Sequence, residues 1–211
     1  MKPRLSTAIA SALIVATLVY PIAAWLLGRT VPGYSHLEQQ ISELGVSGLP
    51  YAWVLTVVLL IDATLVLAIS RALRNVGGDR HRWSLRLLVL YAIVLALGGL
   101  FPCDEHCRPT TMAGLVHVLN VLPSLVAVVG APLLMSRRLA DDPRLTLVAS
   151  MCFTIAVVTG AAVIAALGVF PALGLAGLGQ RIVLACQLSF FALLGFAVIH
   201  TQRAPAVGSA T

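Results

Sequence analysis

Seven consecutive residues, FPCDEHC at 101–107, bring two thiols, two carboxylates and an imidazole together. Cys103 and Cys107 are separated by three residues, a gap that suits either a disulfide across a tight turn or two ligands of a zinc ion. The zinc alternative would add His106 and one more ligand from elsewhere, for which the candidates are His36, Glu43 and His117. Thiols oxidise only in some compartments, so the choice depends on where the surrounding elements place this stretch.

The composition of the chain indicates a membrane protein. Of its 211 residues, 59% are hydrophobic and 10% are charged, and the mean hydropathy is +0.98. This leaves too little polar surface to cover a water-soluble fold. A bilayer core needs about 20 apolar residues per helix, and the sequence holds six such runs: 7–27, 51–70, 84–101, 111–136, 145–167 and 181–200. We therefore predict an all-α integral membrane bundle of six transmembrane helices, a single domain that uses the whole chain.

The arginines and lysines predict the orientation of this bundle, because basic residues near the ends of spans are retained in the cytoplasm. One side receives most of them: Lys2, Arg4, Arg71, Arg74, Arg80, Arg82, Arg86, Arg137, Arg138, Arg144 and Arg203. The other side receives Arg29, Arg108 and Arg181. We expect both termini to be cytoplasmic in a cell membrane, with the net charge of +6 explained by topology and no nucleic acid as a partner. The first run is too long for a signal peptide and is expected to remain a span.

Three connections fall on the outer side in this topology: 28–50, 101–110 and 168–180. In the first, Ser35 and Glu38 have the spacing of a capping box, which predicts a short interfacial helix over 34–45. Its apolar stripe would consist of Leu37, Ile41 and Leu44. The third connection is apolar and rich in glycine, which is compatible with a lid, a re-entrant segment or a loop against the headgroups.

The predicted outer location also bears on the cysteines and on the polar residues inside the spans. An oxidising compartment favours a Cys103–Cys107 disulfide, with the zinc site left open as an alternative.

Asp62 lies near the middle of the second span, where an ionisable group is costly and tends to be functional. The fourth span carries three polar residues on one helix face, at the spacing i, i+3, i+7: His117, Asn120 and Ser124. We expect a polar pocket that opens outward, with Glu43 and Asp104 at its mouth.

Two motifs carry a resemblance to a known family. The first outer connection reads PGYSHLEQQISELG, the third span ends in GGLFPCD, and a histidine stands near the outer end of the fourth span. In these features the chain resembles the bacterial and archaeal membrane family catalogued as domain of unknown function nine hundred ninety-eight. The resemblance implies a six-helix bundle in which Glu43, Asp104 and His117 occupy the polar positions typical of the family. It implies no activity, and it does not extend to Asp62.

The polar groups favour an intramembrane enzyme that applies acid–base chemistry to a lipid or isoprenoid substrate from the outer leaflet, such as a membrane terpene cyclase or a lipid-headgroup hydrolase. The expected catalytic residues are Glu43, Asp62, Asp104 and His117. The expected substrate-binding residues are Tyr34, Tyr51, Trp53, Phe101, Asn120, Gln187 and Arg181. No cofactor is expected. A divalent metal is the alternative, with ligands drawn from His36, Glu43, Asp104, His106 and His117.

Two other function classes remain open at this point. A proton-coupled transporter of small molecules would use the midplane acid Asp62, although no polar exit toward the cytoplasm is visible. A structural or accessory subunit would use small residues such as Gly98 and Gly99 for close helix contact. The expected partners are membrane lipid and a lipophilic small molecule, together with further copies of the same chain.

Overall fold

The computed structural model describes residues 3–75 and 82–203 of the chain. Lys2 and Arg80, which contribute to the orientation prediction, lie outside this part. The described residues are mostly helical, with no strand among them, and the long helices are α1 (Pro3–Thr30), α2 (Trp53–Ala72), α3 (Arg82–Leu100), α4 (Met112–Leu139), α5 (Thr146–Leu167) and α7 (Ala176–Arg203). Each of the six is long and apolar enough to cross a membrane, which confirms the predicted fold class.

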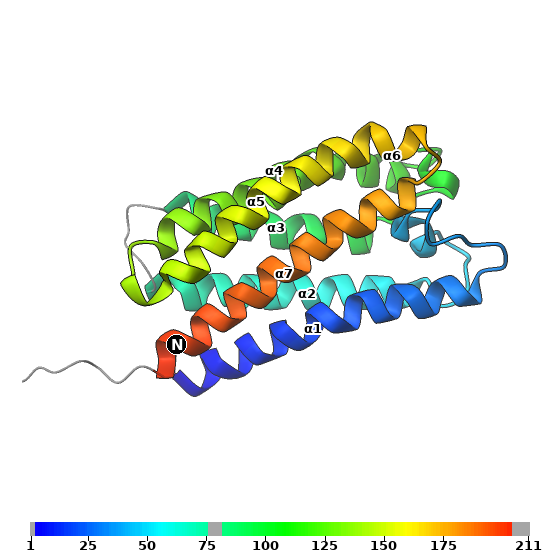
Figure 1. Ribbon diagram of the computed structural model, residues 1–211. Helices are drawn as coiled ribbons and strands as arrows, with labels where there is room; N and C mark the ends of the chain where they lie inside the picture. Colours follow the sequence, from blue (N-terminus) through cyan, green and yellow to red (C-terminus); the bar gives the residue numbers. More distant parts are fainter. Residues whose placement is uncertain (1–2, 76–81, 204–211) are drawn as a thin grey trace, which may run out of the picture.

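The six long helices form a closed ring (Figure 1). Helix α1 packs on α2, α2 on α3, α3 on α4, α4 on α5 and α5 on α7, which returns to α1. One end of the ring carries the connections 31–52, 101–111 and 168–175, and we call it the site end. The two ends of the described chain lie together at the opposite end (Figure 1). This arrangement agrees with an even number of spans, while the side of the membrane that each end faces stays a prediction.

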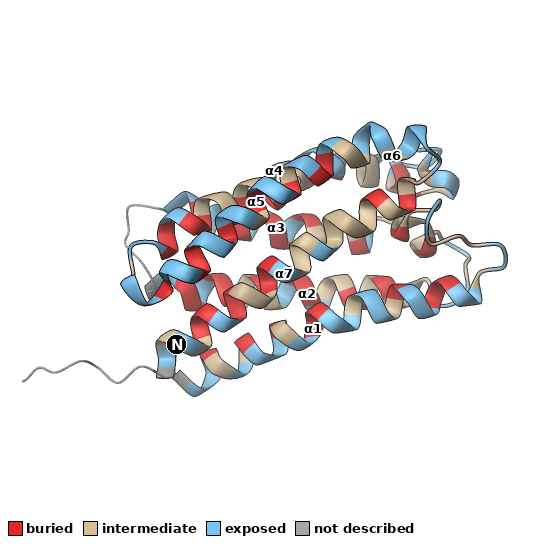
Figure 2. Ribbon diagram, in the orientation of Figure 1, coloured by how far each residue is buried: buried red, intermediate tan, exposed pale blue. Residues whose placement is uncertain are grey.

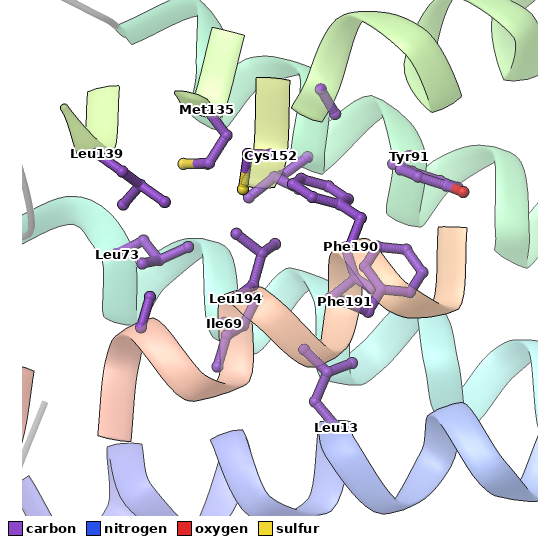
Figure 3. Close-up of a cluster of buried hydrophobic side chains, with 14 of the residues drawn as sticks. Leu13, Ile69, Leu73, Tyr91, Met135, Leu139, Cys152, Phe190, Phe191 and Leu194 are labelled. Atoms are coloured by element: carbon purple, nitrogen blue, oxygen red, sulfur yellow. The ribbon is translucent and has the colours of Figure 1, made fainter. Parts of the chain in front are cut away.

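Burial divides the helices into an inner and an outer face (Figure 2). The exposed surface is largely apolar, and Leu18, Leu122 and Ile164 are 63%, 66% and 74% exposed. Such a surface suits contact with lipid rather than water. Inside, each long helix contributes to one core, shown in Figure 3, through Leu13, Ile69, Tyr91, Met135, Cys152 and Phe190. Cys152 is fully buried there, as expected of a small apolar side chain.

Small residues allow close contact between helices within the ring. A Cβ on Gly99 would lie 3.2 Å from the carbonyl oxygen of Thr56 on α2. The Thr56 hydroxyl in turn donates to the Gly99 carbonyl oxygen over 2.9 Å. At Gly98, the neighbour is the amide of Asn120 on α4. Gly99 therefore serves close packing inside one chain, as small residues do in membrane bundles, whereas Gly98 has more room beside it.

The predicted interfacial helix over 34–45 is wrong in extent. The structure has turns followed by the 3-10 helix η1 (Ile41–Gly45), and Leu37 is exposed where the stripe predicted burial. The reason is competition for backbone carbonyls. Those of Leu37 and Glu38 accept hydrogen bonds from the backbone N–H groups at the start of α7, over 2.8 and 3.1 Å. A continuous helix would also pair the Leu37 carbonyl with the N–H of Ile41, and that N–H instead donates to the Gln180 side chain.

The third connection is a short surface helix, α6 (Val169–Ala172), rather than a re-entrant segment. It ends in a turn at Gly174, whose φ of +72° is readily adopted only by glycine. Helix α7 then begins at Ala176, five residues before the predicted start of the sixth span. This earlier start places Gln180 within α7, where it becomes part of the candidate site.

Candidate functional site

A cavity of about 320 Å³ lies inside the ring beneath the site end, and we call it the site cavity. Most of its wall is apolar, formed by residues such as Leu55, Leu59, Val94 and Val163. Polar side chains line the rest: Tyr20, Gln40, Ser42, Thr56, His117, Asn120, Ser124, Gln180 and Gln187. Among the described residues of this wall there is no carboxylate, lysine or arginine. The cavity therefore suits an uncharged molecule with a hydrogen-bonding group.

His117 is the lining residue best suited to proton transfer. It stands on α4, whose start is capped by the Thr111 hydroxyl, which accepts from Gly114 N over 3.1 Å. The Nδ1 atom of His117 lies 2.8 Å from the carbonyl oxygen of Phe101 at the end of α3. Because a carbonyl oxygen only accepts, Nδ1 carries a proton, and in the neutral ring Nε2 therefore holds the lone pair. The bond fixes both the ring and its tautomer.

Asn120 and Ser124 line the cavity below His117, as the spacing i, i+3, i+7 predicts. The Asn120 amide donates from Nδ2 to the carbonyl oxygen of Val94 over 2.8 Å. Its Oδ1 atom is buried and has no hydrogen-bond partner among the described residues. A buried acceptor without a partner is costly, and a bound molecule with a hydroxyl or amide donor would satisfy it.

Asp104, predicted to be catalytic, does not line the cavity. Its carboxylate accepts from the backbone N–H groups of Thr110 and Thr111 over 2.6 and 2.7 Å, and from the Thr111 hydroxyl over 2.8 Å. The two backbone bonds lower the pKa of Asp104 from 3.8 to about 2. A carboxylate so readily ionised is a poor proton donor, so its role here is to hold the connection 101–111 at the start of α4.

Glu43 and Asp62 also lie outside the cavity wall. Glu43 accepts from the backbone N–H of Gln40 over 2.8 Å and thereby caps η1. Asp62 is buried on α2, 6% exposed, where it interacts electrostatically with Tyr20 and Tyr91. Of the four predicted catalytic residues, the structure therefore places only His117 in the cavity. Glu43 and Asp104, which were expected at the mouth of the pocket, are not among the residues that line it.

Arg181, Tyr34 and His36 form a network that ties the first connection to α7. The Arg181 guanidinium donates to the Tyr34 hydroxyl over 2.8 Å and to Nδ1 of His36 over 3.0 Å. It also donates to the backbone carbonyls of Gln39 and Gly177, over 2.9 and 3.0 Å. Burial and then the charge of Arg181 lower the pKa of His36, which favours the neutral ring that can accept this bond. The predicted binding residues Tyr34 and Arg181 are thus structural anchors.

The other predicted binding residues have mixed outcomes. Gln187 lines the cavity, and Phe101 contributes its backbone carbonyl to His117. Tyr51 and Trp53 are exposed at the site end.

Sequence reasoning missed Gln180, which lines the cavity and accepts from the backbone N–H of Ile41 over 2.5 Å. Gln180 lies seven residues before Gln187, a spacing that places both on one helix face. The sequence did not reveal this because the sixth span was predicted to begin only at residue 181.

The sulfur atoms of Cys103 and Cys107 lie at disulfide distance across the turn, as the predicted pairing requires. The His106 side chain is 67% exposed, with Nδ1 3.6 Å from the Glu43 carboxylate. The zinc site that includes His106 is therefore not assembled. His117 takes its place: the sulfur atoms and a ring nitrogen of His117 all lie within 4.8 Å of one another. The wider metal alternative is not assembled either, since Asp104 and His36 bond elsewhere.

These features define a multi-pass helical membrane protein with a closed ring of six helices and a cavity at one end. The chain belongs to the family whose model is described as "Protein of unknown function (DUF998)", which matches residues 14–197. This match confirms the resemblance inferred from the two motifs. The comparison with curated proteins and the comparison with solved structures gave no match.

The role of Asp104 can be tested through stability. Asp104→Ala leaves the N–H groups of Thr110 and Thr111 without their acceptor, so we expect a lower melting temperature and faster amide exchange over 101–111. Because the pKa of Asp104 is lowered in the fold, this stabilisation is full above about pH 4 and is lost as the pH falls toward about 2. The melting temperatures of the variant and the wild type should converge in that range. Glu105→Ala, at an exposed neighbour, is the control and should match the wild type.

Proposed function

We propose that the protein is an intramembrane enzyme that transfers a proton to or from a lipophilic substrate, a lipid or isoprenoid, bound in the site cavity. His117 is the acid–base group. The observation that carries this proposal is the position of His117 in the wall of a largely apolar cavity. Its ring is fixed there by the bond from Nδ1 to the Phe101 carbonyl, which does not involve Nε2. Histidine is the commonest acid–base group in enzymes.

The lining of the cavity narrows the class of substrate. Its volume of about 320 Å³ accommodates the reacting part of a lipid, whose chain would extend between helices into the bilayer. The described wall contains no lysine or arginine that could bind a phosphate headgroup, so a phospholipid headgroup hydrolase is less well supported. The amides of Asn120, Gln180 and Gln187 offer both donors and acceptors. The best match is an uncharged substrate with a hydroxyl or carbonyl group.

The same lining weakens the terpene cyclase version of the proposal. A cyclase stabilises a carbocation on aromatic faces, and the sequence offered Tyr34, Tyr51, Trp53 and Phe101 for this role. Of the aromatic side chains described, only Tyr20 is part of the cavity wall. Proton transfer at an oxygen-bearing group is therefore the better supported chemistry.

Filling the cavity tests whether it holds such a molecule. A Cβ on Gly98 would make ordinary contact with the Asn120 amide at 3.8 Å, so Gly98→Leu should fold while its side chain occupies the cavity. We expect lipids extracted from the purified wild type and identified by mass spectrometry to include a neutral, oxygen-bearing species that Gly98→Leu does not retain. Gly160→Leu, on α5 and outside the cavity wall, is the matched control and should retain it. Equal retention by Gly98→Leu and the wild type would refute binding in this cavity.

A further inference from the structure

We propose that, when Cys103 and Cys107 are reduced, their thiolates and Nε2 of His117 form a three-ligand site for Zn²⁺ at the edge of the site cavity. The three residues come from two separate segments, the connection 101–111 and helix α4. The two sulfur atoms and one ring nitrogen of His117 lie within 4.8 Å of one another, which is the only such grouping of three among the described residues. This inference goes beyond the proposed function and does not depend on it, because binding of the ion can be measured without a substrate.

The hydrogen bond at His117 is a second, independent feature of a metal site. Histidine ligands almost always donate their other ring N–H to a carboxylate or a backbone carbonyl, which fixes the ring and raises its basicity. His117 does so from Nδ1 to the Phe101 carbonyl oxygen over 2.8 Å. The nitrogen left for coordination is therefore Nε2. His106, which the sequence suggested, is exposed, and its ring nitrogens have only the longer contacts of 3.6 and 3.8 Å to the carboxylates of Glu43 and Glu105.

The cysteines provide the soft ligands that zinc prefers. Cys103 is 2% exposed and Cys107 is partly buried, so an ion between them would be shielded from bulk water. The Ser42 hydroxyl lies 3.3 Å from the sulfur of Cys107 and lines the site cavity, as His117 does. Two thiolates and one imidazole leave a fourth position, which in catalytic zinc sites is taken by water or substrate. Here that position would adjoin the cavity.

The disulfide and the metal-bound form exclude one another, because both use the same two sulfur atoms. Binding of Zn²⁺ requires both thiols to lose their protons. Oxidation by a small-molecule disulfide such as oxidised glutathione would form the Cys103–Cys107 bond, break the glutathione S–S bond and release two glutathione thiolates together with the ion. In the disulfide form Nε2 of His117 is free to act as a base, whereas in the metal-bound form it is a ligand.

Cobalt is the probe for this site, because thiolate ligation of Co²⁺ gives a sulfur-to-metal charge-transfer band. The protein is purified in detergent, reduced without oxygen and titrated with Co²⁺. We expect one equivalent to bind with this band, to be displaced by Zn²⁺, and to be absent from the oxidised protein. Cys103→Ser and Cys107→Ser should each weaken the band. His117→Ala should lower the affinity by roughly 10- to 100-fold or more, since even loss of an outer-shell partner has that effect.

Two control variants separate this site from its competitors. His106→Ala should bind Co²⁺ as the wild type does, and so should Cys186→Ser, which removes a free thiol on α7. Absence of the band from reduced wild-type protein would overturn the proposal. So would a band that survives His117→Ala but is lost in His106→Ala, which would restore the ligand set suggested by the sequence.

Discussion

Replacing His117 by alanine is expected to lower turnover by about 10²- to 10⁴-fold, the usual contribution of a positioned acid–base group. The measurement begins with lipid extracts of cells that express or lack the protein, compared by mass spectrometry to find a product that depends on it. The rate of its formation per amount of protein is then compared among variants. Because His117 lies in the wall of the site cavity, the loss should fall on the chemical step rather than on expression.

Two variants separate proton transfer from simple packing at this position. His117→Gln retains an N–H donor for the Phe101 carbonyl but has no group that titrates near neutral pH, so it should be about as inactive as alanine. His106→Ala changes an exposed ring outside the cavity and should leave turnover unchanged. Full activity in His117→Gln would contradict the acid–base role. Loss of function in Asp62→Asn but not in His117→Ala would favour the proton-coupled transporter instead.

Arg181→Ala is expected to have the largest effect on stability. The guanidinium makes four hydrogen bonds, to Tyr34, His36, Gln39 and Gly177. Loss of these partly buried, charge-assisted bonds should cost about 3 kcal/mol. For a chain of this size, that corresponds to a melting temperature lower by roughly 6 to 12 °C. The thermal transition of the purified protein in detergent measures it directly.

The location of the damage distinguishes this network from a general loss of charge. Hydrogen exchange should accelerate over residues 34–45 and at the start of α7, which Arg181 holds together. Arg29→Ala is the matched control, since its exposed guanidinium lies over the Trp25 ring at 4.9 Å and should contribute less than about 1 kcal/mol. Unchanged exchange over 34–45 in Arg181→Ala would show that the backbone bonds from α7 to Leu37 and Glu38 suffice to hold the connection.

Most of the architecture could be predicted because its cause is local. A run of about 20 apolar residues becomes a transmembrane helix whatever its neighbours are, since in lipid the backbone must satisfy its own hydrogen bonds. The six predicted spans accordingly match the six long helices to within a few residues. The shared face of His117 and Asn120 follows in the same way from the geometry of one helix. The proximity of Cys103 and Cys107 follows from their short separation.

The candidate site could be predicted only in part, because the partner of each polar group was decided by competition between distant segments. The carbonyl of Gln39 bonds to Arg181, 142 residues away, and this bond helps to prevent the helix that the local spacing favoured. The carboxylate of Asp104 bonds to backbone N–H groups rather than facing the cavity.

By itself, then, the sequence determined the membrane class, the six helices, the cysteine pair and the polar face of α4, all of which depend on composition or on spacing within one element. Only the tertiary structure decided that the ring of His117, rather than that of His106, lies near both sulfur atoms. It also decided that Glu43 and Asp104 are used to hold loops. The physical reason is that a hydrogen-bonding group takes the partner that folding brings near it, and that proximity is a property of the whole ring of helices.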